Sequence, residues 1–136
     1  MVLTLSNKAM FPDLFDASIY AFKSKINDLM IRILMPLINT LHKESQELNK
    51  MRFEIIDNPE MVLNIDLDEI YDLLEKNEEQ LKYMLKIVET KKNDDPIFAT
   101  FYDSLNDALT NVLTTSISYA SAEAEMMHKG KLKHAS

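Results

Sequence analysis

Glycine is almost missing from this chain, which has a single glycine, Gly130, among its 136 residues. Tight β-turns, and loops that bring the backbone close to a ligand, usually need glycine because it tolerates backbone conformations that other residues avoid. The shortage therefore favours an all-helical fold with few tight turns. It also leaves no glycine-rich loop that could hold a phosphate group.

Cysteine is absent, which excludes disulfide bonds and thiolate metal sites. The three histidines are His42, His128 and His134, and the sequence contains no nucleophile elbow, phosphate-binding motif or cysteine–histidine pair. We therefore expect a protein that is not an enzyme and that uses no cofactor.

A long hydrophobic run is also missing. The most apolar stretch, residues 28–41, is interrupted by Arg32 and Pro36, whereas a membrane span needs roughly 20 apolar residues. We expect no membrane association there, but a helix that is buried on much of its circumference. The first eleven residues lack a basic segment followed by an apolar core, so no secretion signal is predicted and a cytoplasmic location, in the producing cell or in a host cell, is expected.

Apolar residues recur with helical periodicity along a first predicted helix, from about residue 12 to residue 57. Its first half carries an apolar seam at alternating spacings of three and four: Phe15, Ile19, Phe22, Ile26, Leu29 and Ile33. Pro36 removes a backbone donor, so we expect a kink there. The second half keeps only a narrow apolar stripe: Leu41, Leu48, Met51 or Arg52, and Ile55.

Further helices follow two breaks in the pattern. Residues 57–64, "DNPEMVLN", predict a short helical turn near 59–64, with Asn58 as its cap and Pro59 in its first position. Asp66 and Glu69 then resemble a capping box, ahead of the seam Leu67, Ile70, Leu74, Asn77, Leu81, Met84 and Val88. For Asn77, a place near solvent at the bundle edge is favoured over a buried one. Asp95 and Pro96 begin the last helix, whose seam is Phe98, Phe101, Leu105, Ala108, Val112, Thr115, Tyr119, Ala122 and Met126.

The predicted fold class is all-α: an elongated antiparallel bundle of three long helices, the first kinked at Pro36, with a short helical turn near 59–64. The domain organisation is an N-terminal extension (1–11), one helical-bundle domain (12–129) and a flexible basic tail (130–136). The three helices would span roughly 65, 40 and 50 Å at about 1.5 Å per residue. Because these lengths do not match, a monomer would leave the ends of the first and third helices uncovered. We therefore expect a homodimer, in which the second chain covers them.

Negative charge is concentrated in one segment. Residues 57–79 carry nine acids and a single base, Lys76, a net charge of −8 in a chain whose total is −7. Four of the acids share one helix face: Asp68, Asp72, Glu75 and Glu79. Like charges at these spacings disfavour a helix by a few tenths of a kcal/mol per pair. The face therefore predicts either a binding surface for a basic protein or a surface that only keeps the protein soluble.

The best metal-ligand candidate is "EMMH", which places Glu125 and His128 on one helix face. Di-iron bundles need two such motifs and two further glutamates, and this chain has one motif. The basic residues Lys129, Lys131 and Lys133 form too short a segment for nucleic-acid binding, so we expect none. Contact of this basic arm with an acidic patch of another copy is an equal alternative.

The predicted function is that of a non-enzymatic small acidic helical protein that binds a protein partner with a basic surface. An inhibitor, an adaptor or a secretion chaperone would fit. The alternative is a structural homo-oligomeric helical-bundle subunit. A carboxylate-bridged metal protein is a remote further alternative.

Overall fold

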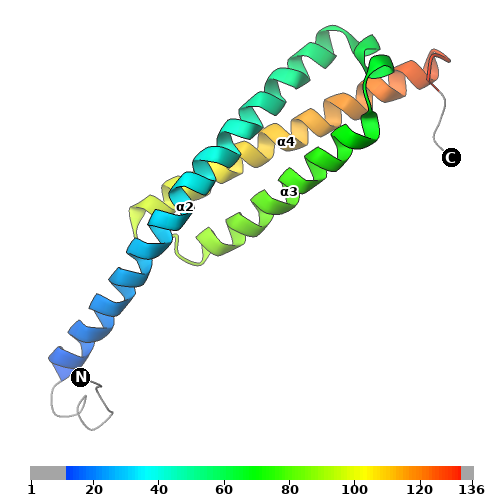
Figure 1. The fold of residues 1–136 in the computed structure, drawn as a ribbon. Coiled ribbons are helices and arrows are strands. Elements are labelled where there is room, and N and C mark those ends of the chain that lie inside the picture. The colour runs from blue at the N-terminus through cyan, green and yellow to red at the C-terminus, as the bar shows by residue number, and fades with distance from the viewer. Residues whose placement is uncertain (1–11, 133–136) are drawn as a thin grey trace. The chain divides into compact units, whose positions relative to one another are not determined.

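The computed structural model describes residues 12–132, with side chains from residue 16 onward (Figure 1). The predicted N-terminal extension, residues 1–11, lies outside the described residues. Helix α2 spans Pro12–Asp57, the 3-10 helix η1 spans Pro59–Asn64, α3 spans Leu67–Glu89 and α4 spans Pro96–His128. No strand occurs within residues 12–132, and the predicted all-α class is confirmed.

The chain divides after Pro36 into two units, the residues up to Pro36 and those from Leu37 onward. Helix α2 contributes to both units and has Pro36 inside it. The division falls at the residue where the sequence predicts a kink, and the kink itself stays a prediction. In the first unit, residues 12–36 belong to α2.

The second unit is a three-helix bundle in which residues 37–57 of α2, α3 and α4 lie side by side (Figure 1). Helix α4 supplies the largest share of its core. All nine seam positions predicted for this helix are buried: Phe98, Phe101, Leu105, Ala108, Val112, Thr115, Tyr119, Ala122 and Met126. Since every third or fourth residue returns to the same side of a helix, this spacing gives α4 one continuous buried side.

The seam of α3 is buried from Leu74 to Val88, while Leu67 and Ile70 near its start are half-buried. Asn77 lies on the buried side, with 6% of its surface exposed. Its Nδ2 donates to the carbonyl oxygen of Leu73 at 2.9 Å, which satisfies the amide within its own helix. The preference for a solvent-exposed Asn77 was therefore wrong, because this local bond lets the side chain be buried without a partner on another helix.

Two of the three predicted N-terminal caps are confirmed. Asp66 Oδ1 accepts from the backbone N–H of Glu69 at 3.2 Å, and Asp95 Oδ1 accepts from that of Ile97 at 3.0 Å. The prediction that Asn58 caps through its side chain is wrong, since that side chain makes no capping hydrogen bond. Its main-chain carbonyl oxygen instead accepts from Met61 N at 3.1 Å, which begins the 3-10 turn.

One end of the second unit is closed by a cluster in which the end of α2, η1, the start of α3 and the end of α4 meet. Its buried members are Ile55, Val62, Tyr119, Ala122 and Met126, and Leu132 packs against them. Gly130 adopts φ +72°, a left-handed conformation that ends α4. Lys131 N then donates to Met126 O at 2.9 Å, so the described part of the predicted tail, residues 130–132, folds back onto the cluster.

Candidate interaction surfaces

The four carboxylates Asp68, Asp72, Glu75 and Glu79, here called the acidic face, lie on the outer side of α3, and all are exposed. At about 100° per residue they lie roughly 100–180° around the helix from the buried residues Leu74 and Leu81. The helix thus presents its core residues on one side and this row of charges on the other.

None of the four carboxylates forms an ion pair with another residue of the described chain. Glu78, one position beside the acidic face, pairs with Lys82 at 3.8 Å. The carboxylates near the start of α3 are favoured by the positive end of its dipole. That effect falls off within the first turn, so it does not extend to Glu75 and Glu79.

An open depression of about 520 Å³ adjoins the first half of this face. It is lined by Asp66, Asp68, Glu69, Ile70, Asp72, Leu73 and Lys76. Four of these residues are acids, and Leu73 is 44% exposed. A lysine or arginine entering here could lay its methylene stem on Leu73 while its cation meets the carboxylates. Sequence reasoning missed Glu69 and Leu73, since Glu69 had been assigned only to the cap and Leu73 falls beside the seam.

No three side chains of the described residues are arranged to hold a metal ion. The motif residue Glu125 pairs instead with Lys129, with 3.2 Å between Oε1 and Nζ. His128, the other residue of the motif, is exposed in the last turn of α4.

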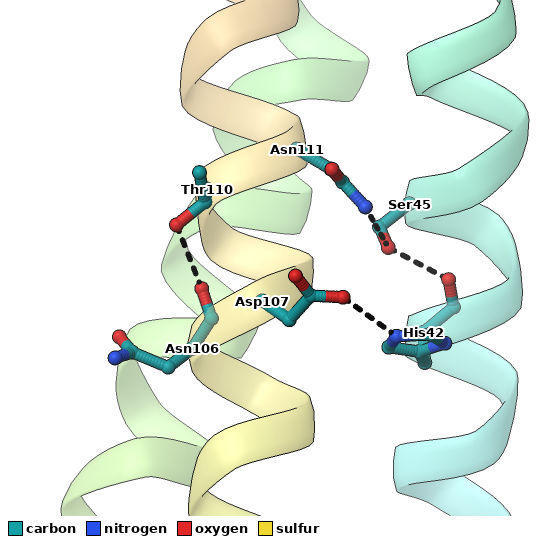
Figure 2. A network of polar contacts seen from close by, with 6 residues as sticks. All are labelled: His42, Ser45, Asn106, Asp107, Thr110 and Asn111. Carbon is teal, nitrogen blue, oxygen red and sulfur yellow. Dashed lines mark hydrogen bonds and ion pairs between the residues drawn. The ribbon is translucent and has the colours of Figure 1, made fainter.

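Serine, histidine and aspartate side chains come together between α2 and α4 (Figure 2). His42 Nε2 lies 3.1 Å from Asp107 Oδ2. The hydroxyl of buried Ser45, however, donates to the main-chain carbonyl oxygen of His42 at 2.7 Å and accepts from Asn111 Nδ2 at 3.4 Å. A catalytic serine needs its hydroxyl hydrogen-bonded to the imidazole. Ser45 and His42 therefore form no nucleophile–base pair, and the polar contacts of this site connect α2 to α4.

The prediction that the helix over residues 28–41 is buried on much of its circumference is wrong, because only Leu34 and Ile38 are buried in that range. The apolar seam of the first half of α2 is not buried either. Its described members, here called the α2 stripe, are between 36% and 66% exposed: Ile19, Phe22, Ile26, Leu29 and Ile33. Phe15 lies outside the described side chains. In the second unit, α2 buries Ile38, Ser45, Leu48 and Ile55, which do not continue the α2 stripe. Continued past Pro36, the stripe would run into Thr40 and Lys43, which are polar residues that are seldom buried.

Two tyrosines, the half-buried Tyr71 and the buried Tyr119, have raised pKa values. Tyr71 Oη donates to Glu123 Oε1 at 3.3 Å, joining α3 to α4. Burial, with the negative charge of Glu123 and this hydrogen bond, raises the pKa of Tyr71 to about 12. Burial and then the charge of Glu54 raise the pKa of Tyr119.

Near the chain end, the hydrogen bond from Lys131 Nζ at 2.6 Å, together with its charge, lowers the pKa of Glu60.

No family model, curated protein or solved structure matches this chain. Within the described residues, the helices lack a segment long and apolar enough to cross a membrane.

Proposed function

We propose that this protein is a non-enzymatic binding protein that engages a protein partner with a basic surface through the outer side of α3. An inhibitor, an adaptor or a secretion chaperone would act in this way. The observation that carries the proposal is the exposed acidic face, whose carboxylates have no cation of the described chain paired with them. The cytoplasmic location expected from the sequence stays a prediction.

The arrangement has an energetic cost that a partner would remove. Asp68 with Asp72, and Glu75 with Glu79, are like charges four residues apart, and each such pair disfavours the helix by about 0.2–0.5 kcal/mol. A basic partner would replace repulsion with attraction. The adjoining depression adds an apolar floor, from Ile70 and Leu73, on which lysine or arginine stems could rest.

The test removes the charges and keeps the shape. In a variant with Asp68→Asn, Asp72→Asn, Glu75→Gln and Glu79→Gln, the isolated protein should be as stable as the wild type or slightly more stable. Wild-type protein used as bait in host extract should capture a partner at low salt and lose it as salt rises, because exposed charges are screened within about 10 Å at 0.1 M salt. The variant should capture much less of that partner at low salt.

A charge-matched control separates a local effect from a change in total charge. Neutralising four exposed acids outside this face, Glu44, Asp57, Glu89 and Asp103, also takes the net charge from −7 to −3. The control should bind like the wild type. Equal capture by all three proteins at both salts would show that the acidic face only keeps the protein soluble.

A second candidate function, a structural homo-oligomeric subunit, is favoured by a different observation. The α2 stripe exposes five large apolar side chains on one side of one helix, and soluble monomers rarely expose contiguous apolar surface of this kind without a function. This candidate requires no contribution from the acidic face.

A further inference from the structure

We infer that the α2 stripe is a dimerisation surface, on which a second copy of this chain docks as a parallel two-stranded coiled coil. The inference rests on the first unit alone and is independent of the acidic face.

The residue types along the stripe suit two strands. Spacings of four and three place Ile19, Ile26 and Ile33 at the a positions of a heptad, and Phe22 and Leu29 at the d positions. β-Branched residues at a combined with leucine at d favour parallel dimers over larger assemblies, and the three isoleucines with Leu29 follow that rule, while Phe22 is the exception. The next positions, Pro36 at d and Thr40 at a, end the pattern where the first unit ends.

The flanking charges distinguish parallel from antiparallel pairing. Positions e and g, beside the seam, carry Lys23 and Met30 at e, and Ser18, Lys25 and Arg32 at g. In a parallel pair each g residue meets the e residue five positions further along the other chain. Lys25 then lies beside Met30 of the second copy and Ser18 beside Lys23, so no two like charges face each other.

An antiparallel pair in register, with Ile19 opposite Leu29 and Phe22 opposite Ile26, brings e beside e and g beside g. Lys23 would then face Lys23 of the second copy, and Lys25 would face Lys25. Like charges placed opposite each other across an interface disfavour that arrangement.

Charge and area also suit a second copy as the occupant. Residues 16–36 carry three bases and two acids, a net charge of +1 in a chain of −7, so the first units of two copies carry little charge with which to repel each other. The five stripe residues are about half exposed, which leaves roughly 100 Å² of each to cover. Two copies would bury about 1,000 Å² before the flanking stems are counted, the lower limit for a specific interface.

The first experiment measures the mass of the full chain in solution, by light scattering or sedimentation equilibrium over a wide concentration range. The wild type should have twice the chain mass. Ile26→Asp, which puts a charge in the seam, should be monomeric, whereas Ser24→Asp, which adds the same charge at the outward f position, should stay dimeric. Circular dichroism checks that both variants keep their helices.

Ile26→Ala guards against misfolding of the charged variant, because alanine favours the helix. It should weaken dimerisation by at least about tenfold, since each dimer loses two buried isoleucine side chains. A monomeric wild type would overturn the inference. The stripe would then contact another part of its own chain or a different partner. So would a trimer, or a dimer unaffected by either change at Ile26.

Orientation is tested by cross-linking, because the chain has no cysteine of its own. Ile19→Cys and Ile33→Cys, each alone, should form disulfide-linked dimers on mild oxidation, since like a positions adjoin in a parallel pair. In an antiparallel pair both cysteines would lie too far from their counterparts, so dimers that fail to cross-link would overturn the parallel arrangement.

The variant lacking the acidic face should dimerise normally. If that variant is monomeric, the dimer interface lies on α3 instead. If the variant stays dimeric and loses only partner capture, the dimer interface is independent of the acidic face.

Discussion

Tyr71 connects the start of α3 to α4 through its hydrogen bond to Glu123. In the unfolded chain the phenol should lose its proton near pH 10, whereas in the folded protein its pKa is about 12. The folded state therefore binds the proton more tightly. The stability from this group is complete below about pH 10 and is lost as pH rises toward 12.

Replacing Tyr71 with phenylalanine should make the free energy of unfolding less sensitive to pH between about 10 and 12. The effect can be measured with urea unfolding at neutral and at alkaline pH. Tyr119 also has a raised pKa, so part of the alkaline loss should remain in the variant. If the free energy of unfolding falls equally in wild type and variant as pH rises, burial and Glu123 do not help Tyr71 to retain its proton.

The cap of α3 allows a matched pair of substitutions. Asp66→Ala removes the oxygen that accepts from Glu69 N and should cost about 1 kcal/mol of unfolding free energy. Asp66→Asn keeps an acceptor oxygen and should cost clearly less. Thermal unfolding of the two variants beside the wild type measures the difference, and equal losses would mean that charge, not the hydrogen bond, stabilises this helix end.

At the scale of single residues, the sequence predicts local chemistry better than distant pairs. The Asp66 and Asp95 caps depend on residues two or three positions away, and they were predicted. The contacts of His42 with Asp107 and of Tyr71 with Glu123 join residues 65 and 52 positions apart. Such pairs depend on how each helix is rotated about its axis, which no local pattern specifies.

Among the elements, α2 and α4 are in direct contact through small buried side chains. Thr115 Oγ1 lies 2.6 Å from the carbonyl oxygen of Asn111 and 3.3 Å from that of Leu48, on the facing helix. Ser45 is also fully buried in this contact. A larger side chain at either position would meet the backbone or side chains of the opposite helix.

Thr115→Leu should therefore destabilise the protein by about 1–3 kcal/mol, although leucine is the better helix former and is more apolar. Thr110→Leu, on the exposed side of α4, is the control and should change stability by less than about 0.5 kcal/mol. Chemical unfolding of both variants gives the comparison. A Thr115→Leu variant as stable as the control would show that the two helices can separate at little cost.

The same periodicity succeeded on α4 and misled on α2. On α4 all nine predicted positions are buried, although Leu113 and Ile117, outside that seam, are exposed. On α2 the described members of the predicted seam, from Ile19 to Ile33, are exposed. Periodicity shows that a helix has an apolar side, but it does not show whether the same chain covers that side.

For the whole molecule, the predicted mismatch of helix lengths is confirmed: α2, α3 and α4 contain 46, 23 and 33 residues. The all-α class follows from composition, because a chain with one glycine has few means of making tight turns. The acidic face was predicted as a row of residues, and the structure adds the depression beside it. That depression also needs Ile70 and Leu73, whose exposure depends on how α3 is rotated in the bundle.

The central claim, that the acidic face recruits a basic protein, is tested most directly by the association rate with the captured partner as ionic strength is varied. For wild type and the charge-matched control, the rate should be fast at low salt and fall steeply as salt rises, while the dissociation rate changes less. The variant without the acidic face should associate slowly, with a rate that depends little on salt. The same steep dependence in all three proteins would contradict the claim, because the attraction would then come from charges elsewhere on the molecule.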